Sequence, residues 1–328
     1  MEAYLRGYYG YRNFGDELLF FGVVKELFTR YSITKLFVEV GDKHWMEDRI
    51  RENYQGLLTE KQLTMITCIS AKQHKYKIIT HIINFLWLWK YKKIFKFFGW
   101  WEVLSDERLF PHDGRNIPLL FNYSVRTGQF ALLWGIGKIR RPRTEKLYKY
   151  LLPKADKVIV RDRDSYAIAK ERWTKGKVYG QKEMDNNVVL YQDFAQEIIQ
   201  SIKHKSSTIK QKYILININR QSVDKHNVQK IIEFCGQYPD HKKLFFPCDM
   251  NDDRHCFLLL KKHISELEVY DWTTHSLADA LSLFFHADGG IGARLHFLLP
   301  LKLYDKPIVA IPYADKINKL IISPKAKI

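Results

Sequence analysis

The sequence has few cysteines, and their spacing excludes the commonest cysteine-based sites. Only four of its 328 residues are cysteines, and no two form the Cys-x-x-Cys pair typical of zinc sites and redox motifs. Cys248 and Cys256 lie near His255 and His263, but this spacing fits no established zinc pattern. We therefore expect reduced thiols, no disulfide framework and no bound metal.

Long apolar runs are also missing. No stretch reaches the roughly 18 apolar residues that a membrane-spanning helix requires. The nearest candidate, 78–89, is shorter and is interrupted by His81 and Asn84. The chain start, residues 1–4, has no feature of a secretory signal peptide. These absences predict a cytoplasmic protein.

Acidic residues are outnumbered by basic ones, 36 against 53, which gives a formal net charge of +17. Such a surface attracts anions, whether phosphorylated small molecules, nucleic acid or an anionic membrane. Nucleic acid is not expected as a partner, because the sequence contains no basic recognition helix and no RNA-type aromatic motif. Hydrophobic residues make up 46% of the chain, which is enough for a sizeable core.

One basic and aromatic segment, residues 72–101, stands apart from the rest of the chain. No Asp or Glu occurs between Lys61 and Trp101, and lysines alternate there with tryptophans and phenylalanines. Basic residues bind anionic lipid, and aromatic rings favour the membrane interface. The segment is therefore a candidate for docking on an anionic membrane surface. The alternative is a helix whose aromatic stripe packs in the core while its lysines face water.

Strand and helix patterns alternate along the chain and predict an α/β protein with two lobes. Short apolar or β-branched runs predict strands at 3–6, 34–40, 63–70, 101–105, 130–135, 157–160, 213–218, 243–247, 268–270, 289–291 and 306–311. A polar, lysine-rich connection at 204–212 divides them into two groups. We expect two Rossmann-like domains, 1–204 and 205–328, each a parallel sheet covered by helices, with a cleft between them. Ligands bind such sheets beyond the carboxyl ends of the strands.

A glycine-rich turn, Gly7–Gly15, joins the first predicted strand to a helix predicted at 17–30, with Asp16 as its N-cap. Glycines let backbone N–H groups approach a ligand closely. Asp16 and Glu17 at the helix start would repel a phosphate, which favours a hydroxyl-bearing ligand. The alternative is a capped turn with no ligand.

Alternating charges, Arg161–Ser165, follow the apolar strand at 157–160. Charges directly after a buried strand are costly unless they are paired or used. Arg161 is nearest the strand end and is placed to reach into the cleft. The alternative is a turn of surface ion pairs.

A second glycine-rich strand end, Gly289–Gly292, is followed closely by Arg294 and His296. If the chain is still extended there, both side chains point to one face. If Arg294 instead begins a helix, both lie in its first turn. Arginine offers a bidentate fork for phosphate or carboxylate, and histidine can donate a proton near neutral pH.

The last motif follows the predicted strand at 306–311. Tyr313 and Lys316 stand three residues apart and bring a phenol and an ammonium to the cleft. The alternative is a tyrosine ring in the core and a solvated lysine.

Taken together, these motifs resemble the polysaccharide pyruvyltransferase family, from about Gly7 to Lys316. The matching segments, in the family's order, are Gly-Tyr-Tyr-Gly…Asn-Phe-Gly-Asp-Glu at 7–17, Gly-Ile-Gly at 135–137, Val-Arg-Asp…Ser at 160–165, Asp193, Gly-x-Arg-Leu-His at 292–296 and Pro…Tyr-x-x-Lys ending at 316. The resemblance implies a glycosyltransferase-B-like fold, phosphoenolpyruvate as donor and a sugar or polyprenyl-linked glycan as acceptor. It also implies that Arg161, Arg294 and His296 serve the donor.

The chemistry that the resemblance implies assigns roles to these residues. We expect His296 to be the acid, and Arg161 and Arg294 to bind the anion and stabilise departing phosphate. The remaining expected donor contacts are Gly292 and Lys316. Acceptor hydroxyls are assigned to Tyr9, Asn13 and Asp16, with Asp16 also in the catalytic set. No metal or organic cofactor is required.

Two other functions are also compatible with the sequence. A nucleotide-sugar glycosyltransferase of the same fold would use the glycine-rich turn and Arg294 to bind a diphosphate. A relative that only binds glycan, without catalysis, is suggested by Ser105–Phe110, where bulky charged side chains replace the glycine triplet usual in the family.

Overall fold

The computed structural model describes residues 1–54, 56–70, 95–99, 130–134, 145, 157–160, 163–174, 188–190, 193–206, 209–312 and 317. Its chain divides into two compact units. Unit 1 consists of Met1–Tyr11, Val23–Glu47 and Thr59–Phe194, and unit 2 consists of Arg12–Gly22, Asp48–Leu58 and Ala195–Ile328. The boundary expected between residues 204 and 205 lies inside unit 2.

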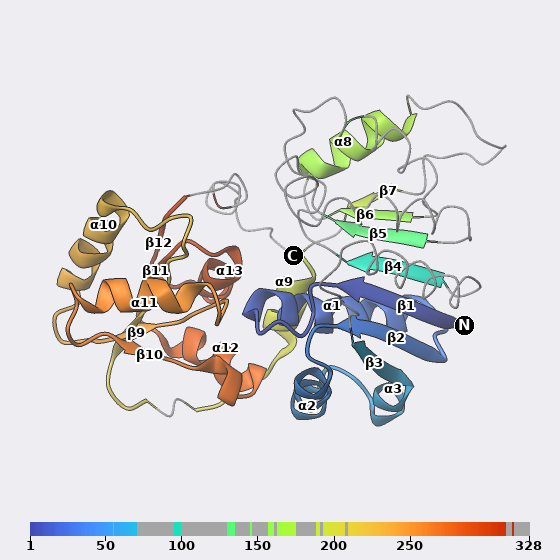
Figure 1. The fold of residues 1–328 in the computed structure, drawn as a ribbon, viewed down its shortest axis with the longest axis horizontal. Helices are drawn as coiled ribbons and strands as arrows, with labels where there is room; N and C mark the ends of the chain where they lie inside the picture. Colours follow the sequence, from blue (N-terminus) through green and yellow to red (C-terminus); the bar gives the residue numbers. More distant parts are fainter. Residues whose placement is uncertain are drawn as a thin grey trace, which may run out of the picture. The chain divides into compact units, whose positions relative to one another are not determined.

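The first sheet contains seven strands in the order β3-β2-β1-β4-β5-β6-β7 (Figure 1), and all of its strand pairs are parallel. Its strands are β1 (Glu2–Gly7), β2 (Lys35–Val40), β3 (Ile66–Ser70), β4 (Phe95–Gly99), β5 (Phe130–Trp134), β6 (Lys157–Val160) and β7 (Val188–Leu190). The helices described along this part of the chain are α1 (Phe14–Arg30), α2 (Lys43–Asn53), α3 (Glu60–Met65), α8 (Arg163–Thr174) and α9 (Phe194–Ser201). This strand order is that of a doubly wound fold.

The second sheet contains five strands in the order β10-β9-β8-β11-β12, again with parallel pairs. Its elements are β8 (Tyr213–Ile216), α10 (Lys225–Gly236), β9 (Lys242–Phe245), α11 (Asp253–Lys261), β10 (Glu268–Val269), a 3₁₀ turn (Trp272–Thr274), α12 (Leu277–His286), β11 (Gly290–Gly292), α13 (Leu295–Leu303) and β12 (Ile308–Ala310). Both sheets therefore confirm the predicted α/β class. In the second sheet the strand order reverses between β8 and β11.

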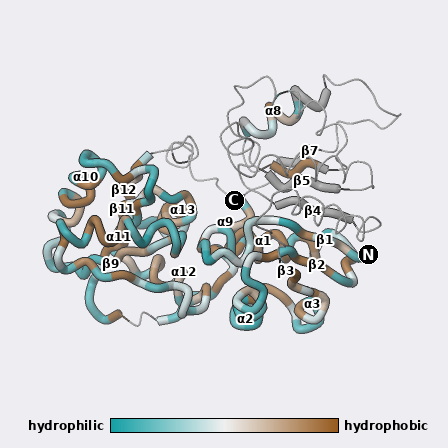
Figure 2. Tube along the Cα trace, in the orientation of Figure 1, coloured by the Kyte–Doolittle hydropathy of each residue, from teal (hydrophilic) through white to brown (hydrophobic). Residues whose placement is uncertain are grey.

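Successive side chains of a strand point to opposite faces of its sheet, so the strands of the second sheet show which helices cover each face. Ile214 and Ile216 of β8 belong to one buried cluster with residues of α10 and α11. The other face receives α13. A Cβ at Gly290 would lie 2.5 Å from Leu301, and one at Gly292 would lie 2.4 Å from the Phe297 ring. The glycines of β11 thus let α13 pack directly on the strand backbone. Figure 2 shows mostly hydrophilic colouring along α2, whose sequence is rich in charged residues.

Unit 2 also contains two segments from the first sixty residues. Phe14 is fully buried, and its ring centroid lies 4.9 Å from Phe246, 5.5 Å from Trp272 and 5.8 Å from Phe284. Arg49 is 2% exposed and donates to the Glu17 carboxylate at 3.0 Å. Aromatic packing of this kind contributes substantially to stability, so these segments are integral parts of unit 2.

The start of α1 corrects one prediction. The helix begins at Phe14 rather than at Glu17, and Asn13 is its cap instead of Asp16. The Asn13 side-chain oxygen accepts hydrogen bonds from the backbone N–H groups of Gly15, at 3.1 Å, and Asp16, at 3.3 Å. Asp16 and Glu17 lie in the first turn, where their charges complement the helix dipole.

Two further predictions differ from the structure. Residues 95–99, part of the segment considered for membrane docking or for an amphipathic helix, form β4, which pairs with β1 and β5. The strand expected at 63–70 begins at Ile66, because Thr59 and Gln62 form a capping box that starts α3 first. Residues 101–105, 135–137 and 71–94 lie outside the described residues, and so do Arg161, Tyr313 and Lys316. In the described part of the chain, no helix combines the length and apolar character needed to cross a bilayer.

Candidate functional site

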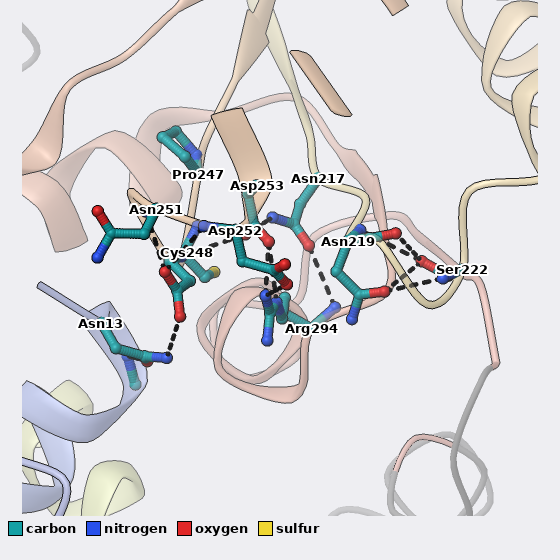
Figure 3. Close-up of polar contacts among 12 residues, drawn as sticks. Asn13, Asn217, Asn219, Ser222, Pro247, Cys248, Asn251, Asp252, Asp253 and Arg294 are labelled. Atoms are coloured by element: carbon teal, nitrogen blue, oxygen red, sulfur yellow. Dashed lines mark hydrogen bonds and ion pairs between the residues drawn. The ribbon is translucent and has the colours of Figure 1, made fainter. Parts of the chain in front are cut away.

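The loops at the carboxyl ends of β8, β9 and β11 meet around one buried side chain, Asn217 (Figure 3). Its amide nitrogen donates to the Phe246 carbonyl oxygen at 2.9 Å and to Oδ2 of Asp253 at 3.2 Å. Its side-chain oxygen accepts the backbone N–H of Arg294 at 3.2 Å. One amide therefore joins three loops at the point where the strand order reverses, which is where open α/β sheets bind ligands.

Asp253, the first residue of α11, is the charged centre of this cluster. It is fully buried, and its Oδ2 accepts the backbone N–H groups of Cys248, at 2.9 Å, and Asp249, at 3.2 Å. Its Oδ1 accepts Nε and Nη2 of Arg294 at 3.2 and 2.6 Å. Burial raises the pKa of Asp253 above its ordinary value, and the adjacent Arg294 guanidinium opposes that rise. Two backbone N–H groups, an amide and a guanidinium donate to it, which suits an ionised carboxylate.

Arg294 lies at the N-cap of α13, with backbone angles φ −81° and ψ 134°. Its Nη2 also contacts Oδ2 of Asp252 at 2.8 Å. The guanidinium is thus held between two carboxylates at the carboxyl edge of the sheet. Of the two alternatives for this segment, the structure shows the second, since α13 begins directly after Arg294 and contains His296 in its first turn.

The first glycine-rich motif reaches the same cluster within unit 2. The backbone N–H of Phe14 donates to the Cys248 carbonyl at 2.7 Å, and Asn13 forms an antiparallel bridge with Asp249. The Asn13 amide nitrogen also contacts Oδ2 of Asp249 at 3.4 Å. Arg12 adopts the left-handed region, with φ +57°, directly before this bridge. Asn13 is therefore both the cap of α1 and a partner of the 248–250 turn.

Gly15 brings α1 against His296. A Cβ at Gly15 would lie 2.1 Å from Nδ1 and 2.7 Å from Cγ of the His296 ring. Only glycine leaves room for the imidazole at this distance. The structure thus brings together two motifs that the sequence left far apart, Asn-Phe-Gly-Asp-Glu at 13–17 and Gly-x-Arg-Leu-His at 292–296.

A second buried polar pair, Glu17 and Arg49, lies at the start of α1. Glu17 is 1% exposed, and its pKa is raised to about 8 by burial, against the opposing effect of Arg49. Nη1 of Arg49 donates to the His275 carbonyl at 2.6 Å. The Arg49 guanidinium also lies over the Trp272 ring, 5.6 Å from its centroid.

The remaining predicted residues stand as follows. Tyr9 belongs to unit 1 and is 1% exposed, and its carbonyl accepts the Gly41 N–H at 2.9 Å. The close approach of the Phe297 ring explains why position 292 is a glycine, and a contact of Gly292 with the donor stays a prediction. Arg161 and Lys316 lie outside the described residues.

The cysteines and histidines considered as metal ligands lie in the segment 248–263. Cys248 and Cys256 are buried free thiols, and burial raises the pKa of both. Across the described residues, no group of three or more His, Cys, Asp or Glu side chains is arranged to hold a metal ion.

Sequence reasoning missed Asn217, Asp252 and Asp253 as site residues. Asn217 directly follows the apolar run of β8, and a polar residue at that point is a signal that a ligand or a network is present. The aspartates follow β9 by a few positions, and only the fold shows that they face Arg294.

A family model for polysaccharide pyruvyl transferase matches residues 13–314. The chain belongs to this family. The matched region begins at Asn13, the cap of α1, and includes the complete Gly-x-Arg-Leu-His motif. Membership in the family indicates a transferase of polysaccharide pyruvylation.

Solved structures show the same fold. The UDP-GlcNAc 2-epimerase of Neisseria meningitidis, bound to UDP-GlcNAc, has a TM-score of 0.63 at 12% identity, with 94% of this chain and 82% of that chain covered. The UDP-GlcNAc 2-epimerase of Methanocaldococcus jannaschii has a TM-score of 0.57 at 10% identity, with 100% and 93% covered. These likenesses confirm the predicted glycosyltransferase-B-like fold of this pyruvyl transferase family member. No curated protein sequence matches the chain.

Proposed function

We propose that the protein transfers pyruvate from phosphoenolpyruvate onto a sugar of a polysaccharide or lipid-linked glycan, forming a pyruvate ketal and releasing phosphate. The main support is Arg294, a guanidinium fixed at the carboxyl edge of the second sheet, next to the point of strand reversal. An arginine fork matches the phosphate and carboxylate of this donor. The net charge of +17 favours the approach of such an anion.

In the proposed reaction His296 donates a proton to C3 of the enol, which makes C2 electrophilic. A first sugar hydroxyl adds to C2 and loses its proton. A second hydroxyl then replaces the phosphate at C2, also losing its proton, so that two new C2–O bonds close the ketal ring. Arg294 stabilises the departing phosphate. No metal or organic cofactor takes part in this scheme.

The proposed donor site is completed by Arg161, Gly292 and Lys316. Asp16, with Asn13 and Tyr9, is proposed to orient the acceptor. Support for Asp16 comes from its place in the first turn of α1, one residue after the glycine that faces His296. The Asn13 side chain already caps the helix, so substituting it would disturb the start of α1 as well as any acceptor contact.

The place of action that we propose is the cytoplasmic face of a membrane. The composition of residues 72–94, basic and aromatic without acidic residues, supports docking on anionic lipid. Residues 95–99 of the same segment form β4 within the first sheet and are not part of the proposed docking surface. Such docking would bring the enzyme to a polyprenyl-linked acceptor.

One alternative donor has a specific observation in its favour. The Neisseria meningitidis protein of similar fold is bound to UDP-GlcNAc, so a nucleotide sugar is the second candidate. At 12% identity this likeness shows only the fold. A relative that binds glycan without catalysis is the third reading.

The test is to incubate the protein with phosphoenolpyruvate and candidate glycans and to analyse the products by mass spectrometry. We expect a pyruvate ketal on the glycan and free phosphate in equal amounts. Arg294→Ala should weaken phosphoenolpyruvate binding by about tenfold or more, because a charged hydrogen bond contributes about 1.5–3 kcal/mol. Arg51→Ala is the matched control, since Arg51 is exposed on α2 and pairs only with the exposed Asp48 in the described structure. Tight binding of a nucleotide sugar with no product from phosphoenolpyruvate would reject the proposal.

A further inference from the structure

Two carboxylates share one nitrogen of Arg294, and their surroundings are opposite. Nη2 lies 2.6 Å from Oδ1 of Asp253 and 2.8 Å from Oδ2 of Asp252. The Asp253 side chain is 0% exposed, whereas that of Asp252 is 39% exposed. Sequence neighbours in contact with the same guanidinium therefore differ greatly in their access to water.

Asp253 is fixed in place. Its two oxygens accept five hydrogen bonds, from the Asn217 amide, the backbone of Cys248 and Asp249, and two nitrogens of Arg294. Moving this carboxylate would leave several buried donors without an acceptor, at a cost of about 1–3 kcal/mol for each. It stays where it is whether or not a ligand is bound.

Asp252 is held much more weakly. It precedes α11 but its side chain makes no capping bond, because Asp249 accepts the Asp252 N–H at 3.1 Å and serves that helix end instead. Among the residues that the structure describes, Arg294 is the partner of the Asp252 carboxylate. A half-exposed ion pair of this kind contributes only about 0–1 kcal/mol, so a rotation into water breaks it easily.

We infer that the Asp252 carboxylate occupies the position that an anionic group of the donor takes on Arg294, and that Asp253 is the positioning residue that keeps the guanidinium in place during the exchange. This inference rests on the proposed role of Arg294 in donor binding. With Asp252 in contact, the single positive charge of Arg294 faces two negative charges, so monoanions are bound poorly. A phosphate monoester carries enough charge and enough acceptor oxygens to displace the exposed carboxylate and then to pair with the guanidinium in its place.

The two aspartates should therefore respond in opposite directions to the same substitution. Asp252→Asn removes a competing and repelling charge, and phosphoenolpyruvate should bind about two- to tenfold more tightly at low ionic strength. Asp253→Asn introduces an amide N–H among groups that are already donors. Arg294 is then held less firmly, and phosphoenolpyruvate should bind more weakly. The control is Asp240→Asn, which makes the same change in net charge at an exposed position in the turn before β9, at the amino end of the strands.

Calorimetric titration of the full chain measures this, first with phosphoenolpyruvate and then with inorganic phosphate. Tighter binding by Asp252→Asn than by wild type, with Asp240→Asn unchanged, supports the inference. Equal or weaker binding by Asp252→Asn, or an equal gain in the control, overturns it. If wild type binds inorganic phosphate but not phosphoenolpyruvate, the proposed donor is wrong. The inference about Asp252 is then judged from the affinities of wild type and the variants for inorganic phosphate. If neither anion binds to wild type or to Asp252→Asn, the inference fails too.

Steady-state kinetics separate positioning from simple loss of structure. Asp253→Asn should raise KM for phosphoenolpyruvate while KM for the glycan stays constant, whereas a general loss of folded protein lowers the rate and leaves both constants unchanged. Because Asp253 is buried, this variant is accompanied by a thermal melt. If Asp253→Asn does not fold, the inference is tested by comparing anion binding of Asp252→Ala and Asp252→Asn with that of wild type.

Discussion

Substitution of Gly15 by alanine tests the contact between α1 and His296. The added methyl carbon would lie 2.1 Å from Nδ1 and 2.7 Å from Cγ of the imidazole, and 3.0 Å from its Cβ. Cγ and Cβ are close to the root of the side chain, so rotation about χ2 does not relieve the clash. Extra volume in a packed site typically costs about 1–3 kcal/mol. We expect Gly15→Ala to lower the free energy of unfolding by that amount, despite the better helix propensity of alanine, and to lower turnover because the imidazole moves.

Urea unfolding combined with a double-mutant cycle measures this. Gly236→Ala is the matched control, because a Cβ at Gly236, at the end of α10, meets no atom within 4 Å. It should leave the midpoint unchanged or raise it slightly. In the His296→Ala background the same substitution at Gly15 should cost at least about 1 kcal/mol less, since coupled neighbours show interaction energies of about 0.5–3 kcal/mol. An equal cost in both backgrounds would refute the proposed clash.

Three further predictions concern catalysis, pH and membranes. His296→Ala should lower kcat by about 100- to 10,000-fold with little change in donor affinity, because a proton donor acts mainly in the transition state; wild-type turnover would remove His296 from the mechanism. Burial raises the pKa of Glu17 from 4.5 to about 8, so the folded state binds this proton more tightly than the unfolded state, and the stability it contributes is lost as pH rises from about 4.5 through 8. Glu17→Gln should therefore flatten the decline of unfolding free energy over that range in pH-dependent urea melts, and an unchanged slope would contradict the assignment. Liposome sedimentation should show binding to anionic but not neutral vesicles, weakened by salt and by reversal of the charges of Lys90, Lys92 and Lys93; binding to neither vesicle would end the docking hypothesis.

Most of the fold was predictable from sequence because its strands are short apolar runs separated by helical patterns, but β4 and β7 were not among the predicted strands. The runs at 158–160 and 213–216 need no tertiary context to be recognised, since a parallel strand buried on both faces is apolar throughout. The start of α1 was predicted three residues late. Asp16 is a good N-cap by residue type, but Asn13 has the backbone position from which its side chain reaches the N–H groups of Gly15 and Asp16.

The site was predictable only in part. Gly292 was predicted to be part of the donor site, whereas the structure gives Gly290 and Gly292 a packing role beneath α13. The partners of Arg294 were not predictable, because Asp252 and Asp253 lie about forty residues earlier in the chain and a pairing of β8, β9 and β11 is needed to bring them together. Local spacing carries no information on such a pairing.

The construction of unit 2 from separate stretches has a consequence for how the protein is made. Phe14 leaves the ribosome more than two hundred residues before Phe246, Trp272 and Phe284, the rings that enclose it. At about 5–20 residues per second, this delay is about 10–50 seconds. During this time the Phe14 ring lacks these three native partners, and unit 2 is completed only when the last strands emerge. The two units therefore do not fold one after the other during synthesis. A fragment that starts at residue 205 would lack both Phe14 and Arg49.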